Sequence, residues 1–167
     1  MKHQTPLTKL IGIFITTCFV FLPSARAVDP PPDGGYPNQN TAEGEDALLS
    51  LTSGFFNTAV GYHALLDDRS GSLNTALGAQ ALLVNTTGRS NTATGSQALL
   101  SNSTGQRNTA TGADALLQNN TGSSNTAIGT SALLLNLTGF GNTAAGREAA
   151  SVGERSCGRP TSCARRH

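Results

Sequence analysis

The sequence of 167 residues contains no tryptophan, and no lysine follows Lys9. Aromatic residues make up only 5% of the chain and charged residues 13%. Because bulky apolar side chains are scarce, this composition excludes a fold organised around one large globular core. It also lacks the basic stripe with interleaved aromatic residues that is typical of nucleic-acid-binding domains, and we predict no nucleic-acid partner.

Motifs that carry catalysis or bind metal are missing as well. The sequence contains no nucleophile elbow, no phosphate-binding loop and no Cys/His set with metal-ligand spacing. Asp67 and Asp68 are adjacent, but further oxygen ligands at the spacing of a calcium site are absent. We therefore predict a protein that is not an enzyme and that uses no cofactor and no metal.

What the sequence does contain is a tandem repeat of seventeen residues. The pattern N-T-A-x-G-x-x-A-L-L-x-N-x-T-G-x-x recurs in one register without insertion or deletion. Its seven copies begin at Asn40, Asn57, Asn74, Asn91, Asn108, Asn125 and Asn142, and we number the repeat positions 1 to 17 from these residues. A fixed period predicts a solenoid, in which each copy forms one coil and buries its apolar face against its neighbours.

Two sets of repeat positions are candidates for the corners and the core of the coil. Position 5 is always glycine, which suggests a corner that needs a positive φ. These corner glycines are Gly44, Gly61, Gly78, Gly95, Gly112, Gly129 and Gly146. Positions 9 and 10 are Leu-Leu in six copies and are the only sizeable apolar groups that recur, so we predict that both form the core seam. The seam residues are Leu48, Leu49, Leu65, Leu66, Leu82, Leu83, Leu99, Leu100, Leu116, Leu117, Leu133 and Leu134.

Within a coil, positions 1 to 4 contain threonine and often a β-branched fourth residue, which predicts a strand of three or four residues. Positions 6 to 11 contain good helix formers, and the asparagine at position 12 could end a helix in the left-handed conformation. We therefore expect one short strand plus one or two helical turns per coil. A second short strand in place of the helical turns is the alternative.

Strands stacked in register would align the asparagines and threonines of positions 1 and 2 in rows, about 4.8 Å apart along the axis. Ladders of side-chain amides stabilise repeating sheets, which explains the asparagines structurally. A threonine row could instead order ice, but that use requires pairs of threonines, and only one is fixed per coil. Positions 6, 7, 11, 16 and 17 vary freely and are predicted to face outward, so His63 is interpreted as a solvated side chain.

The first 27 residues are predicted to be a cleaved secretory signal peptide. Lys2 and Lys9 supply a basic start, residues 10–22 an apolar run, and Ala25-Arg26-Ala27 a cleavage site. The run of ~13 residues is too short for a membrane span, which needs about 20, so we expect no span after cleavage. Residues 28–39 contain four prolines and are predicted to be an extended linker to the solenoid at 40–151.

Residues 152–167 break the pattern and form an irregular basic tail. Solenoids often end in an atypical cap, and this is one interpretation of the tail. A truncated or out-of-frame end of a longer gene is the other. Cys157 and Cys163 do not have zinc-site spacing, and a local disulfide between them suits an oxidising compartment.

The repeat resembles those of exported bacterial proteins of the tail-fibre-domain-containing type. It is more distantly similar to the N-S-x-A-I-G head repeats of YadA-type trimeric autotransporter adhesins. The segments GRSNTATG (88–95) and GSSNTAIG (122–129) carry this likeness, which extends over residues 40–149. The resemblance implies a parallel β-solenoid or β-roll, here of seven 17-residue coils, as a homotrimer or with other fibre proteins.

Together these observations predict a non-enzymatic, exported structural or adhesive repeat protein, secreted or held at a cell or fibre surface. The alternative is a soluble solenoid that binds a glycan or ice through its variable positions or its threonine row. An enzyme built on a solenoid groove would need acids and bases clustered on one face, and the repeats offer only scattered ones.

Overall fold

The computed structural model describes residues 37–151. The predicted signal peptide, residues 28–36 of the predicted linker and the tail with Cys157 and Cys163 lie outside the described residues. The last three linker residues form a short 3-10 turn, η1 (Pro37–Gln39), directly before the first coil. The carbonyl oxygen of Asn38 accepts a hydrogen bond of 3.1 Å from the Phe56 amide, so this part of the linker already pairs with the solenoid.

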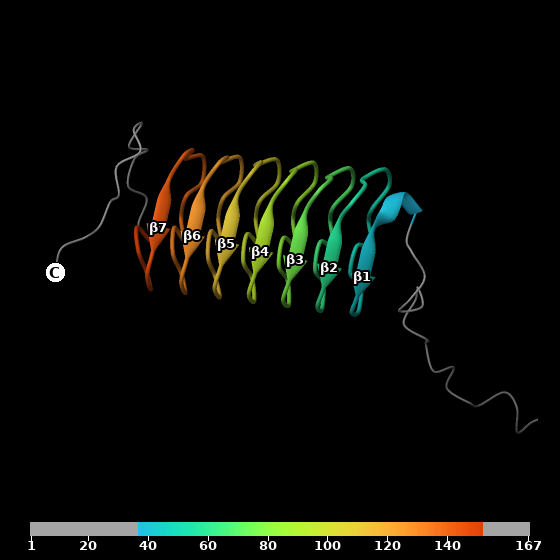
Figure 1. Ribbon diagram of the computed structural model, residues 1–167, viewed down its shortest axis with the longest axis horizontal. Coiled ribbons are helices and arrows are strands. Elements are labelled where there is room, and N and C mark those ends of the chain that lie inside the picture. Colours follow the sequence, from blue (N-terminus) through green and yellow to red (C-terminus); the bar gives the residue numbers. More distant parts are fainter. Residues whose placement is uncertain (1–36, 152–167) are drawn as a thin grey trace, which may run out of the picture. The chain divides into compact units, whose positions relative to one another are not determined.

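Each copy of the repeat contributes one three-residue strand to a single parallel sheet (Figure 1). The strands are β1 (Thr41–Glu43), β2 (Thr58–Val60), β3 (Thr75–Leu77), β4 (Thr92–Thr94), β5 (Thr109–Thr111), β6 (Thr126–Ile128) and β7 (Thr143–Ala145). They follow one another in sequence order, and each residue pairs with the residue seventeen positions later, as Thr92 does with Thr109. The parallel β-solenoid implied by the resemblance is confirmed.

The segment from position 6 to position 11 takes neither of the two predicted forms, because it is a run of hydrogen-bonded turns. In the fourth coil, Gln97 (φ 58°) and Leu99 (φ 53°) both lie in the left-handed region. This conformation costs an ordinary residue about 1–2 kcal/mol. Hydrogen bonds to the neighbouring coils offset this cost. The Leu99 amide donates to the carbonyl of Ala115 in the next coil at 2.9 Å, and the Gln97 amide donates to the carbonyl of Ala79 in the previous coil at 2.9 Å. The turns are therefore stabilised by pairing along the axis.

The core is thinner than the predicted leucine seam. Leucines at position 9 are buried, together with the alanines at positions 3 and 8, as Leu99, Ala93 and Ala98 are in the fourth coil. The prediction is wrong for position 10, because the left-handed residue before it turns this side chain outward. Leu49 is 66% exposed, and the other leucines at this position are half-buried. These are Leu66, Leu83, Leu100, Leu117 and Leu134.

The position-5 glycines form corners with positive φ, as predicted. Gly95 has φ 132°, and a Cβ atom added there would lie 2.6 Å from the carbonyl oxygen of Gly112. The corner thus needs glycine for two reasons, the backbone conformation and the close approach of the next coil.

Candidate binding surfaces of the solenoid

A buried row of asparagines at position 1 joins each coil to the next. The Oδ1 atom of Asn91 accepts from the backbone amide of Asn108 at 3.0 Å and from its Nδ2 at 3.1 Å. The Nδ2 atom of Asn91 donates to the carbonyl of Gly105 at 2.9 Å. This first ladder extends from Asn40 to Asn142 and confirms the predicted amide row.

A second buried ladder lies at position 12, where the sequence suggested a helix end. Asn102 does not take the left-handed conformation. Its Nδ2 donates to the Oδ1 of Asn85 at 2.9 Å and to the carbonyl of Gly105 at 3.0 Å. The ladder continues through Asn119 and Asn136.

The second ladder begins at Asn85 in the third coil, because position 12 of the second coil is Asp68. Its side chain is fully buried, and its Oδ1 accepts from the Gly71 amide at 2.7 Å. The other carboxyl oxygen, Oδ2, has no hydrogen-bond partner among the residues from 37 to 151. Burial raises the pKa of Asp68 from 3.8 to about 7, and hydrogen bonds from Gly71, Asn85 and Asn74 lower it by less. A neutral carboxyl therefore suits this place better than a carboxylate.

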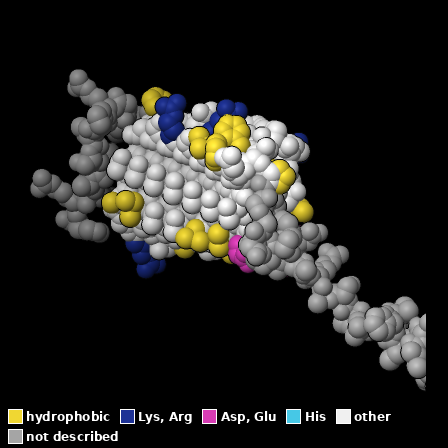
Figure 2. Space-filling view, turned by 45° about the vertical axis from the view of Figure 1, so that its right-hand side comes forward, with side chains coloured by type: hydrophobic (Ala, Val, Ile, Leu, Met, Phe, Trp, Pro, Cys, Tyr) yellow, Lys and Arg dark blue, Asp and Glu magenta, His cyan; other side chains and the backbone are white. Residues whose placement is uncertain are grey.

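The outer face of the sheet carries an unbroken row of threonines at position 2. Figure 2 shows side chains in regular rows across one face of the solenoid, most of them neither charged nor hydrophobic. Position 4 also points outward, but it is threonine only in β4 and β5. The remaining residues at position 4 are Glu43, Val60, Leu77, Ile128 and Ala145. The paired threonines that an ice-ordering face requires are thus confined to two adjacent coils.

A second candidate surface is formed by positions 13 to 17, between the second ladder and the next strand. Its exposed arginines are Arg69, Arg89 and Arg107, and its exposed aromatic residues are Phe55, Phe56 and Phe140. No acidic residue occurs at these positions in any described coil. We call this surface the arginine edge.

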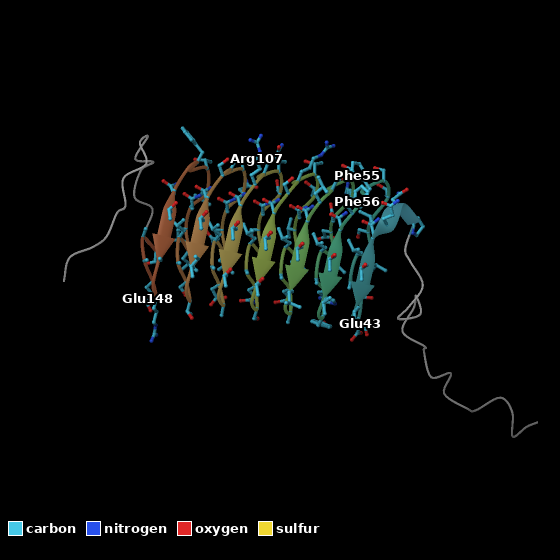
Figure 3. The ribbon with its side chains drawn as sticks, viewed as in Figure 1. Glu43, Phe55, Phe56, Arg107 and Glu148 are labelled. Atoms are coloured by element: carbon cyan, nitrogen blue, oxygen red, sulfur yellow. The ribbon has the colours of Figure 1, made fainter. Side chains whose placement is uncertain are left out.

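Most acidic residues lie on the other side of the strands, at positions 4 to 7. These residues are Glu43, Glu45, Asp46 and Glu148, which are exposed, and the half-buried Asp114; the exposed Asp67 lies apart from them at position 11. Arg147 is the one arginine at positions 4 to 7 within residues 37–151. Figure 3 shows Phe55, Phe56 and Arg107 along one margin of the solenoid and Glu43 and Glu148 along the opposite margin. We call this second surface the acidic edge.

His63 lies on the acidic edge and is only partly solvated. Its Nε2 atom is 3.3 Å from the Oδ2 of Asp46, and its ring stacks on Tyr62 with 3.7 Å between the centroids. The predicted outward position is correct, and the neighbouring coil supplies the carboxylate. One histidine with one carboxylate provides no nucleophile and no third group for catalysis.

Within the described part of the chain, no three His, Cys, Asp or Glu side chains come together in a group that could hold a metal ion. Residues 37–151 also contain no helix long and apolar enough to cross a membrane. Asp67, for which the sequence predicts no calcium site with the adjacent Asp68, is exposed, whereas Asp68 is buried beside the second ladder. The structure does not bring the two carboxylates to one surface.

The two charged edges could have been found in the sequence only by noting the repeat position of each charged residue. Arg69, Arg89 and Arg107 stand at positions 13, 16 and 17, so no single repeat position is basic. Stacking of the coils brings them to one edge. Comparison of the chain with protein-family models, with curated proteins and with solved structures finds no match.

Proposed function

We propose that this chain is a non-enzymatic, exported structural or adhesive protein of a cell or fibre surface. The observation that carries the proposal is the division of each coil into two kinds of position. Buried positions repeat almost without change and bond each coil to the next, whereas outward positions differ from coil to coil. Such a scaffold holds varied side chains at a regular spacing, which suits presentation to a partner.

Export and assembly belong to the same proposal. The predicted signal peptide supports secretion or a surface location. The half-exposed row of leucines at position 10 offers an apolar strip that further copies of the chain would cover in a trimer.

Cell fractionation tests the location directly. The full chain, expressed in a bacterial host, is expected outside the cytoplasm with a mature N-terminus at Val28, as read by mass spectrometry. Light scattering of the exported protein then measures its mass, and a trimer supports a fibre segment. Uncleaved protein confined to the cytoplasm would contradict the proposal.

The second candidate function is a soluble binding module, and the arginine edge favours a glycan over ice as its ligand. Aromatic and arginine side chains are the residues most often responsible for binding energy in interfaces. Paired threonines, by contrast, occupy only β4 and β5. A compact monomer in the light-scattering experiment would support this function over the fibre.

A further inference from the structure

We propose that the arginine edge binds an anionic polysaccharide whose chain lies along the axis of the solenoid. The inference rests on the glycan binding proposed above as the second candidate function, and it names the chemical class of the glycan and the surface that binds it.

The backbone fixes the spacing of the side chains on this edge. The Arg107 amide donates to the Arg89 carbonyl at 3.0 Å, and the Ser90 amide donates to the Ser72 carbonyl at 3.0 Å. Such bonds between positions 17 and 16 of successive coils continue to Gly141. The spacing at positions 16 and 17 is therefore that of stacked strands, about 4.8 Å per coil, and a ligand meets the side chains of these positions, Arg89 and Arg107 among them, in a line. Arg69 stands at position 13 of the same edge and is not part of this row.

The arginines on this edge are available to a ligand. Arg69, Arg89 and Arg107 are exposed, and none of them forms an ion pair within residues 37–151. The acid nearest to them in sequence is Asp68, directly before Arg69, and it is buried; the nearest exposed acid is Asp67. Arginine binds carboxylate and phosphate groups through two parallel hydrogen bonds, and three successive coils each supply one such group.

Apolar side chains flank the arginines along the same line. Phe55 and Phe56 are 43% and 52% exposed and pack edge to face with 5.6 Å between their ring centroids. Leu73 follows in the second coil at 54% exposure, and Phe140 in the sixth coil at 62%. A contiguous apolar patch on a polar surface marks an interaction site, and Phe55, Phe56 and Leu73 lie in two coils joined by the hydrogen bond from the Leu73 amide to the Phe55 carbonyl. A sugar polymer presents C–H surfaces for these rings and acidic groups for the arginines.

Two other partners fit the edge less well. A nucleic acid is bound chiefly through many phosphate contacts, and three arginines supply few of them. A second copy of the chain could set its acidic edge against the arginine edge. The acidic edge, however, also carries Arg147, and the coils of β3, β4 and β6 contribute no charge to it, since their positions 4 to 7 are uncharged.

Retention of the full chain on polygalacturonate, a carboxylated polysaccharide, tests the inference. Neutral dextran and single-stranded DNA serve as comparison ligands. The variant Arg89→Ser/Arg107→Ser removes two of the cations. Serine already occupies both positions in the fifth coil as Ser123 and Ser124, so the fold is expected to tolerate it. The control Arg147→Thr removes a cation from the acidic edge and places there the residue found at the same position as Thr130.

We expect the chain to be retained on polygalacturonate but not on dextran, with retention lost as salt is raised. The double variant should weaken the affinity for polygalacturonate at least about tenfold, because the loss of even one charge-assisted hydrogen bond is enough to change an affinity about tenfold. The control variant should change the affinity less than about twofold. Equal affinity of the double variant and the control would overturn the inference. Stronger retention on DNA, or self-association that the double variant abolishes, would assign the edge to another partner and overturn it too. A failure to bind polygalacturonate would not contradict the proposed export and assembly, because fractionation and light scattering test those separately.

Discussion

The two asparagine ladders lie side by side in the same core, yet only one is complete. The first ladder has asparagine in all seven coils. The second has asparagine in four coils, and its position is occupied by Leu51 in the first coil and by Asp68 in the second. In the first ladder each Oδ1 accepts the backbone amide of the next coil, as Asn91 does from Asn108. In the second, Asn102 bonds to other side chains and to a carbonyl of its own coil.

This difference explains which position tolerates substitution. An asparagine that satisfies a backbone amide of the neighbouring coil cannot be replaced without leaving that amide buried and unpaired. An asparagine bonded to its equivalents in other coils loses less when the row ends. We therefore expect substitutions in the two ladders to have different costs.

The largest effect is expected from Asn108→Ala in the first ladder. The change leaves the buried Asn125 amide without its partner, and the Gly122 carbonyl loses one of its two hydrogen bonds but keeps the one from Asn119. We expect the free energy of unfolding to fall by about 1.5–4.5 kcal/mol, of which about 1–3 kcal/mol comes from the unpaired amide and about 0.5–1.5 kcal/mol from the lost hydrogen bond to Gly122. Urea denaturation followed by circular dichroism measures this. Asn120→Ala, at an exposed position of the same coil, is the control and should change stability by less than about 0.5 kcal/mol.

A smaller effect is expected from Asn102→Ala in the second ladder. The carbonyl of Gly105 keeps a hydrogen bond from Asn91, and no backbone amide loses its partner. We expect a loss of about 1–3 kcal/mol in the same denaturation experiment. A loss as large as that of Asn108→Ala would show that the ladders are equivalent and that the comparison is unfounded.

The third prediction concerns Asp68, which stands in place of an asparagine next to the second ladder. Its substitution is expected to raise the free energy of unfolding, unlike the first two. Asp68→Asn should stabilise the protein by about 1–3 kcal/mol at pH 8, because an amide can donate where a buried carboxylate cannot. In the unsubstituted chain the folded-state pKa of Asp68, about 7, lies above its ordinary value of 3.8. The folded state therefore binds the proton more tightly, and stability should fall as the pH rises from about 4 to about 7 and then level off.

Denaturation between pH 4 and pH 8 separates this effect from general charge effects. In Asp68→Asn the fall in stability over that range should disappear. Asp67→Asn removes a charge from the adjacent exposed position and should leave the fall in place. The same pH profile for both variants would place the titrating group elsewhere.

Much of the coil could be predicted because its rules are local. Asn-Thr-Ala before glycine gave the strand, and the invariant Gly95 gave the corner, since only glycine combines a positive φ with a close backbone approach. The asparagine row at position 1 followed from stacking in register. These features need only one copy of the repeat and the fact that copies stack.

The outward turn of the position-10 leucines could not be predicted in the same way. Leu99 and Leu100 are both apolar, so hydrophobicity alone assigns both to the core. Which of them is buried depends on the left-handed conformation of Gln97 and Leu99. That conformation is locally unfavourable, and hydrogen bonds to the neighbouring coils stabilise it.

The sequence by itself determined the period, the strand, the corner and the first ladder, because each depends on residue types that recur every seventeen positions. Only the tertiary structure decided the left-handed turns, the second ladder next to the buried Asp68, and the placement of three arginines on one edge and of most acids on the other. The physical reason is that those features depend on contacts between coils. A hydrogen bond from one coil to the next, or the alignment of charges from different coils, exists only when the coils are stacked.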